Sequence, residues 1–393
     1  MKRKTVYFTA PQQVELREES LPALGADDVL VETICSSISA GTEMLVYRGQ
    51  FSHRSDSHDT LSSDLCFPLA FGYACVGVIK DTGKRADRSL KDKLVFGFAP
   101  HASAFICHPS SLIFAPASFP AEACSFLPNM ETAVNLVHDA APILGERVLV
   151  LGQGVVGLLV ASLLKEFPLE KLVTSDCFQL RRNASREIGV DDSFDPSLLK
   201  DNNSDSTENN NDKSKSHAQP QSILESKSQS IPQSNLQTKS ESAPQSNLQS
   251  IQQSAPQSNS KTISQFDYAQ NFDLTFELTG SPSALDDAIA MTAFSGRIVI
   301  GSWYGDKRAE VDLGGAFHRS RIKMISSQVS TISPELSGRW DKARRFHVAW
   351  EALRRIQPQK WITHRFPIEK ADEAYRLLDE NPQETIQVIF NYT

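Results

Sequence analysis

The chain has 393 residues, and 40% of them are hydrophobic, which is enough for two ordinary domains with cores of their own. Its 40 basic and 47 acidic residues give a formal net charge of −7, and the absence of a long basic block argues against a nucleic-acid partner. The sequence has no run of about 18 apolar residues, and its start becomes polar before a signal-peptide core develops. We therefore predict a cytoplasmic protein without a membrane partner.

Short β-like runs fill the N-terminal part of the chain. They include DDVLVETI, YACVGVI and DKLVFGF, and polar or glycine-bearing turns separate them. This pattern predicts a small antiparallel barrel over residues 1–125.

From residue 145 onward, strand-like and helix-like runs alternate. RVLVLG precedes VVGLLVASLLKEF, KLVTSD precedes RRNASREIGV, and FDLTFELTG, SALDDAIAMTAF and GRIVIGS follow further along. Apolar strands that alternate with amphipathic helices are typical of a parallel sheet covered on both faces. The sequence therefore predicts an α/β protein in which a doubly wound parallel-sheet domain follows the barrel.

A low-complexity segment over residues 201–265 interrupts this second domain. It consists mostly of Ser, Gln, Asn, Lys and Pro, and Pro220, Pro232, Pro244 and Pro256 recur every 12 residues. Such a segment buries too little apolar surface to offset the entropy of ordering. We expect a disordered insert in a surface loop; a partner-binding role stays open, although polar low-complexity segments often have no specific ligand.

A glycine pattern, G-x-G-x-x-G, lies between the strand RVLVL and the helix that follows it. Its first glycine permits a tight turn, its second lets the backbone approach a pyrophosphate, and its third lets the helix pack on the strand. Asp176 ends the next strand, 19 positions after the last glycine, where a carboxylate accepts hydrogen bonds from ribose hydroxyls and repels a 2′-phosphate. The sequence thus predicts NAD as the cofactor. The loop residues expected to hold it are Gly152, Gly154, Val155, Val156 and Gly157.

Two arginines, Arg181 and Arg182, follow Asp176 closely. They could weaken the discrimination against a 2′-phosphate, so NADP stays open as an alternative cofactor. The interpretation favoured for both is a solvated helix face. The arginines of the later run SGRWDKARR are expected on a solvated helix face as well.

Further contacts to the cofactor are expected after two later strands. Thr279 and Gly280 follow FDLTFEL, and Ser302 follows RIVIG. The carboxyl ends of strands are where open α/β sheets bind ligands, so these residues are predicted to contact the dinucleotide.

With these features placed, the ordered chain resembles the medium-chain dehydrogenase/reductase superfamily, the alcohol dehydrogenase group. The resemblance rests on VLVETICSSISAGTEMLVYRG, FPLAFGYACVG, VLVLGQGVVGLLVASLL, FDLTFELTGSPSALDDAI and ITHRFPIEKADEAYRLLDE, and SISAGTE is similar to the branch that contains bacteriochlorophyllide dehydrogenase. It implies a GroES-like catalytic domain over 1–125, a Rossmann NAD(P)-binding domain over 126–335 and a C-terminal segment, 336–393, that rejoins the catalytic domain. A homodimer is expected by the same analogy.

The resemblance also implies where zinc ligands would stand. Zinc-dependent members carry a cysteine where this chain has Ala40, and a G-H-E triplet where it has a glycine followed by Tyr73 and Ala74. Met130 or Glu131 falls near the third ligand position. Alanine cannot bind a metal, a neutral phenol is a poor zinc ligand, and one carboxylate cannot rebuild a site that needs three protein ligands. The cysteines of the family's structural zinc lobe are missing too, so we predict that no zinc is bound.

Hydroxyl groups are then the candidates for stabilising the alkoxide that hydride transfer creates. Thr42 matches the family position whose hydroxyl contacts the substrate oxygen, Tyr73 stands at the former metal corner, and Ser39 could assist. Tyr73 acts either as a donor or as a space-filling ring. Glu43 is expected to orient the loop or to act as a local cap or salt-bridge residue. His101 lies in a loop that could border the cleft; a structural role is favoured for this lone histidine, and a functional one stays open.

The function predicted from these features is a zinc-independent transfer of hydride between NAD(H) and a small alcohol or carbonyl substrate. Two alternatives stay open. One is an enone or quinone reductase that uses NADPH, and the other is a catalytically silent dinucleotide-binding sensor or scaffold.

Overall fold

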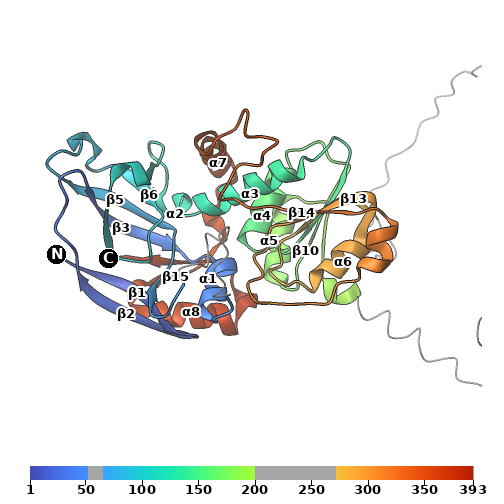
Figure 1. The fold of residues 1–393 in the computed structure, drawn as a ribbon, viewed down its shortest axis with the longest axis horizontal. Helices are drawn as coiled ribbons and strands as arrows, with labels where there is room; N and C mark the ends of the chain where they lie inside the picture. The colour runs from blue at the N-terminus through green and yellow to red at the C-terminus, as the bar shows by residue number, and fades with distance from the viewer. Residues whose placement is uncertain (52–64, 200–270, 393) are drawn as a thin grey trace, which may run out of the picture. The chain divides into compact units, whose positions relative to one another are not determined.

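The computed structural model describes residues 1–51, 65–199 and 271–392, so the predicted insert at 201–265 lies outside the described residues. The described chain forms two mainly antiparallel sheets and one parallel sheet (Figure 1). The predicted α/β fold class, with an antiparallel barrel-like part and a doubly wound part, is confirmed. None of the described helices is both long and apolar enough to cross a membrane.

The antiparallel part combines both ends of the sequence. Its seven-stranded sheet has the order β15-β16-β3-β5-β6-β8, with β7 also paired to β3, and its small sheet has the order β2-β1-β4. Side chains of β3 alternate between buried and more exposed positions, as expected for a strand with one face on a core. The strands are β1 (Lys2–Ala10), β2 (Gln13–Ser20), β3 (Val29–Ser37), β4 (Leu69–Ala70), β5 (Cys75–Thr82), β6 (Leu94–Gly97), β7 (Ala104–Cys107), β8 (Leu112–Phe114), β15 (Ile362–Pro367) and β16 (Gln387–Asn391).

The parallel sheet has the strand order β11-β10-β9-β12-β13-β14. Numbered from β9, this is the order 3-2-1-4-5-6 of dinucleotide-binding folds, in which the chain reverses direction across the sheet between β9 and β12. Ligands bind such sheets at that reversal, outside the carboxyl ends of the strands. The strands are β9 (Arg147–Leu151), β10 (Lys171–Ser175), β11 (Asp192–Phe194), β12 (Phe272–Glu277), β13 (Thr292–Ile300) and β14 (Lys323–Ser326).

Helices cover the parallel sheet and support the antiparallel part. Helix α4 is apolar on nearly all sides because it is buried against the sheet and against α3. Helix α8 packs on α1 and β2. The helices are α1 (Ala40–Tyr47), α2 (Ala121–Cys124), α3 (Leu127–Ala140), α4 (Val155–Leu164), α5 (Gln179–Ile188), α6 (Ala284–Met291), α7 (Lys342–Ile356) and α8 (Ala371–Glu380).

The C-terminal segment divides differently from the expected boundary at residue 336. Helix α7 packs against α3 and α4, beside the parallel sheet, whereas β15 and β16 join the antiparallel sheet. Strand β16 pairs antiparallel with β3, with Ile389 opposite Ser37. The return to the antiparallel part therefore begins after α7.

Arg345 on α7 is buried, whereas the sequence predicted that it would lie on a solvated helix face. Its side chain is fully buried, and its guanidinium donates to Glu131 Oε1 at 2.6 and 3.1 Å and to Asn135 Oδ1 at 2.6 Å. It also donates to the backbone carbonyls of Val329 and Thr331. The prediction was wrong because this arginine ties α7 to α3 and to the loop after β14, a contact that local composition does not reveal.

Candidate functional site

The glycine loop forms the tight strand-to-helix turn that the motif predicts. Gly152 follows β9 with φ +88°, and a Cβ there would stand 2.6 Å from the Leu278 carbonyl oxygen at the end of β12. A Cβ on Gly157 would stand 1.9 Å from the Gly152 carbonyl oxygen, so this glycine lets α4 lie against the turn. Both positions therefore exclude any side chain for reasons internal to the fold.

Gly154 differs from these two glycines because a Cβ at this position would meet nothing within 4 Å. It is the N-cap of α4, followed by Val155 and Val156. The first N–H groups of a helix have no carbonyl partner within the helix and attract anions. The open space beside Gly154 together with these donors fits a pyrophosphate.

Asp176 is hydrogen-bonded directly to the backbone of this loop. Its buried carboxylate accepts hydrogen bonds from the backbone N–H groups of Gln153 at 2.7 Å and Phe178 at 2.8 Å. The adjacent Gln153 side chain is fully buried, and its Oε1 has no hydrogen-bond partner among the described residues. A carboxylate with remaining acceptor sites and an amide oxygen without a described partner at the turn are suited to ribose hydroxyls.

The two arginines that follow do not lie on a solvated face. Arg182 is buried and donates to the Asp176 carbonyl oxygen at 2.7 Å and to Asp195 at 2.8 Å. Arg181 has a terminal nitrogen 3.9 Å from Asp176 Oδ2 and also donates to two carbonyls near the start of β16, those of Pro382 and Thr385. The expectation of solvated arginines was wrong because both are used to hold the residues around Asp176.

The structure also brings the later cofactor candidates together. The Gly280 N–H donates to Ser302 Oγ at 2.9 Å, which joins the ends of β12 and β13. Thr279 donates to Glu277, a fully buried carboxylate that also accepts a 2.5 Å hydrogen bond from the Tyr304 hydroxyl. Burial, together with this carboxylate, raises the pKa of Tyr304. Sequence reasoning missed Glu277 and Tyr304 because only the sheet geometry pairs them.

Three hydroxyl groups meet where the family resemblance places the substrate oxygen. The Tyr73 hydroxyl donates to Ser39 Oγ, and it lies 3.5 Å from Thr42 Oγ1. All three side chains are half-buried. Burial raises the pKa of Tyr73, so the phenol keeps its proton at neutral pH and is a donor rather than a base.

The positions that correspond to zinc ligands hold other chemistry. Ala40 begins α1, Ala74 is buried, and Met130 belongs to the apolar core. Glu131 is engaged by Arg345, and burial raises its pKa. Among the described ranges, no group of three or more His, Cys, Asp or Glu side chains is placed to hold a metal ion.

Glu43 and His101 lie directly behind the hydroxyl groups. Glu43 accepts a hydrogen bond from the Ser39 backbone N–H, which confirms the expected local cap. His101 is fully buried and bonded to Glu43, in line with a structural histidine. Sequence reasoning considered both residues separately and did not pair them.

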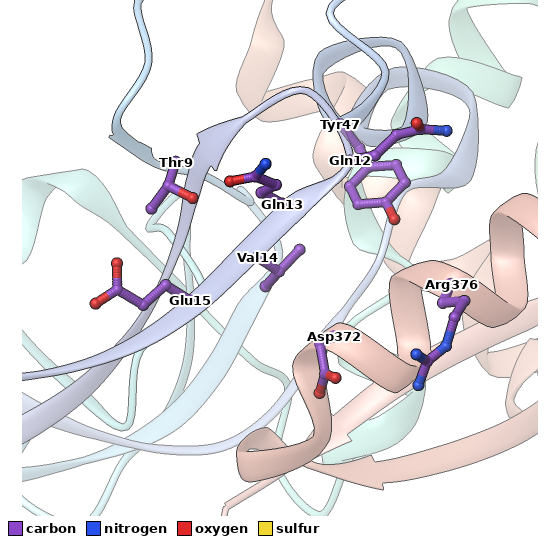
Figure 2. A pocket seen from close by; sticks show the side chains of 8 residues that line it. All are labelled: Thr9, Gln12, Gln13, Val14, Glu15, Tyr47, Asp372 and Arg376. Atoms are coloured by element: carbon purple, nitrogen blue, oxygen red, sulfur yellow. The ribbon is translucent and has the colours of Figure 1, made fainter.

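A surface hollow of about 490 Å³ shares no residue with this site (Figure 2). It lies between the β1–β2 hairpin, Tyr47 at the end of α1, and α8. Its polar lining offers no hydroxyl cluster or glycine turn, so we assign it no part in the chemistry. The lining residues are Thr9, Gln12, Gln13, Val14, Glu15, Tyr47, Asp372 and Arg376.

Comparison with known proteins identifies the fold. No protein-family model and no curated protein matches the chain. Among solved structures, the short chain alcohol dehydrogenase rspB of Escherichia coli CFT073, complexed with NADH, superposes with a TM-score of 0.66 at 16% identity over 99% of both chains. The chain has an alcohol dehydrogenase fold.

Other structures with this fold are similar over their whole length. L-idonate 5-dehydrogenase from Escherichia coli K-12 MG1655 gives a TM-score of 0.67 at 14% identity over 100% of this chain and 98% of its own. 2R,3R-butanediol dehydrogenase from Bacillus subtilis gives 0.65 at 14% identity over 99% of each chain. The resemblance to medium-chain dehydrogenases/reductases is thus confirmed at the level of the alcohol dehydrogenase fold.

Proposed function

We propose that this protein is an NAD(H)-preferring oxidoreductase that interconverts an alcohol and a carbonyl compound without zinc. The observation that carries the proposal is the meeting of Tyr73, Ser39 and Thr42. In the resemblance this corner belongs to the metal, and here the ligand positions hold Ala40, Tyr73 and Ala74 instead.

The dinucleotide side of the proposal is supported by the loop geometry. The space beside Gly154 and the free donors of α4 suit the pyrophosphate, and Asp176 suits the ribose. When bound, NADH supplies the hydride. The structures of similar fold include one complexed with NADH and one bound to NADP, which supports a nicotinamide dinucleotide without choosing between the two.

The chain's own hydroxyl groups supply the proton. As hydride adds to the carbonyl carbon, the C=O π bond breaks and its electron pair moves to oxygen, which then takes the Tyr73 proton. Thr42 donates a second hydrogen bond to the same oxygen. For the transfer, the phenol proton turns from Ser39 Oγ to the substrate oxygen, and the Ser39 hydroxyl donates to the phenol oxygen in its place. Ser39 then gives its proton to the phenolate and takes one from water.

A substrate panel tests the proposal directly. NADH absorbance is followed with aldehydes and ketones, NAD⁺ reduction with alcohols, and NADPH oxidation with enones and quinones. We expect turnover of at least one alcohol or carbonyl compound with NAD(H), unchanged by chelator and without bound transition metal. Turnover of enones alone with NADPH would favour the reductase alternative, and dinucleotide binding without turnover would favour the sensor alternative.

The proposals for the substrate, the oligomeric state and the location in the cell rest on the sequence and on its resemblance to medium-chain dehydrogenases/reductases. A small alcohol or carbonyl compound is the proposed partner, and a homodimer in the cytoplasm stays a prediction.

A further inference from the structure

A buried carboxylate–imidazole pair lies behind the three hydroxyl groups. Glu43 and His101 have no exposed surface, and His101 Nε2 lies 2.9 Å from Glu43 Oε2. The other donors to Glu43 are the Ser39 backbone N–H, 2.8 Å from Oε1, and the Tyr375 hydroxyl, 2.6 Å from Oε2. A carboxylate only accepts, so Nε2 of His101 carries a hydrogen.

The other edge of the His101 ring is fixed as well. Its Nδ1 lies 2.7 Å from Ser36 Oγ, which lies 2.7 Å from the Tyr392 hydroxyl. The ring also packs edge-on against Phe390 of β16, with centroids 5.0 Å apart. Hydrogen-bonding contacts therefore run without a break from Tyr392 through Ser36 and His101 to Glu43.

His101 also touches the backbone that carries Tyr73. Gly72 has φ +110°, and a Cβ there would stand 2.4 Å from His101 Cδ2. The His101 backbone N–H donates to the Phe71 carbonyl oxygen at 3.0 Å. The His101 ring therefore lies against the backbone at Gly72, next to Tyr73, and through Glu43 it acts on the position of Ser39, while the His101 backbone holds Phe71.

Burying a carboxylate is costly unless hydrogen-bond donors in a fixed geometry compensate for its lost hydration. Glu43 meets that condition with three donors from different parts of the chain. In a site without a metal, the hydroxyl groups need another framework that holds their oxygens at a fixed separation.

We infer that Glu43 and His101 are positioning residues that hold the Tyr73 and Ser39 hydroxyl groups in their hydrogen-bonded arrangement. Glu43 holds the Ser39 backbone, and His101 holds both Glu43 and the segment that ends in Tyr73. This inference rests on the proposed function for its kinetic consequences, whereas its structural consequence can be measured without any substrate.

The first measurement uses the full chain with tyrosine isotopically labelled at Cζ. The Tyr73 resonance is identified among the seven tyrosines by its loss in Tyr73→Phe. We expect His101→Leu to shift or broaden this resonance, and His101→Gln, which keeps a donor toward Glu43, to restore it at least in part. Glu43→Gln serves as the second variant if His101→Leu does not fold.

A matched control separates positioning from general loss of stability. Glu131→Gln removes another buried carboxylate, the partner of Arg345, and is expected to leave the Tyr73 resonance unchanged. A Tyr73 resonance that stays at its wild-type position in folded His101→Leu and Glu43→Gln overturns the inference.

The second measurement is a double-mutant cycle on single-turnover hydride transfer, with the carbonyl compounds that the panel identifies. We expect Glu43→Gln to slow the step by about 10- to 100-fold in the wild-type background and by less than about 3-fold in the Tyr73→Phe background. NADH affinity should stay within about 2-fold. Equal losses in both backgrounds contradict the inference. If no substrate is found, the proposed function fails while the resonance still decides the positioning role.

Discussion

Replacing Tyr73 with phenylalanine removes one oxygen atom and keeps the ring that packs against the core. Loss of a positioned proton donor costs about 100-fold or more in the chemical step. We expect that loss in single-turnover reduction of a carbonyl compound, with unchanged NADH affinity. Tyr7→Phe, which removes a hydroxyl bonded to Glu19, should have no effect on the rate, and an equally fast Tyr73→Phe enzyme would assign the ring a space-filling role.

The protonation of Tyr73 gives an expected pH profile. Burial raises its pKa above the ordinary value of 10.0, so the donor form is fully present at neutral pH and is lost only as pH rises through the raised pKa. Single-turnover reduction should therefore be flat from about pH 6 to about pH 9 in its dependence on this group. A reduction rate that increases with pH over that range would mean that the phenolate is the active form.

The proposed preference for NAD predicts that cofactor choice depends on the charge at Asp176. Asp176→Asn keeps an oxygen for one of the two backbone donors and removes the repulsion of a 2′-phosphate, while Arg181 stays 3.9 Å from the position of Oδ2. We expect the ratio of NADPH to NADH affinity to increase by about 10-fold or more. Fluorescence titration of both dinucleotides measures it. The double variant with Arg181→Ala should lose most of the gain, and an unchanged ratio in Asp176→Asn would remove Asp176 from the ribose site.

The positions of individual residues could be predicted where they depend on the backbone geometry of neighbouring residues in the sequence. Gly152, Gly157 and Asp176 follow from a turn and a strand end within one βαβ unit. The partnership of Glu43 with His101 could not be predicted, because it joins residues 58 positions apart through the register of the antiparallel sheet. Arg345 and Glu131, 214 positions apart, pair through the packing of α7 on α3, which is equally invisible to local sequence.

At the scale of elements, the turn between β9 and α4 contains one glycine that the fold requires and another that leaves space for a ligand. Gly157→Ala places a Cβ 1.9 Å from a backbone oxygen, so it should lower the free energy of unfolding by about 2 kcal/mol or more. Gly154→Ala meets nothing within 4 Å, so its stability should stay within about 1 kcal/mol of wild type.

For NADH affinity, we expect the Gly154 variant, which is the more stable of these two variants, to show the direct effect. Gly154→Ala fills the space for the pyrophosphate and should weaken NADH binding by about 10-fold or more. Urea unfolding and calorimetric titration measure the two effects. Normal NADH affinity in Gly154→Ala would place the pyrophosphate elsewhere.

The parallel-sheet elements were more predictable than the C-terminal ones. Continuous apolar runs such as RVLVL identify strands buried on both faces. Helix α7 and strand β16 lie in the same terminal stretch but join different sheets, and hydrophobic periodicity carries no information about which neighbour an amphipathic helix will choose.

For the whole molecule, the buried Arg345 is expected to contribute strongly to stability. Arg345→Leu leaves the Glu131 carboxylate and Asn135 without their donor, and breaking a buried pair from one side costs about 3–5 kcal/mol. Urea unfolding measures the loss. Arg354→Leu, which breaks an exposed pair on the same helix, should cost less than about 1 kcal/mol. Removing both charges, as Arg345→Leu with Glu131→Leu, should recover part of the loss, and an additive double variant would contradict the pairing.

The pairing of β16 with β3 has a consequence for synthesis on the ribosome. The Ile38 backbone N–H donates to the Val388 carbonyl oxygen, and Ser36 is hydrogen-bonded to Tyr392. The antiparallel sheet beside the hydroxyl groups is therefore incomplete until β16 has left the ribosomal exit tunnel. The parallel sheet is complete before that moment. A nascent chain should therefore gain dinucleotide affinity before catalytic competence. Until β16 is added, chaperones would encounter an incomplete antiparallel domain attached to a complete parallel-sheet domain.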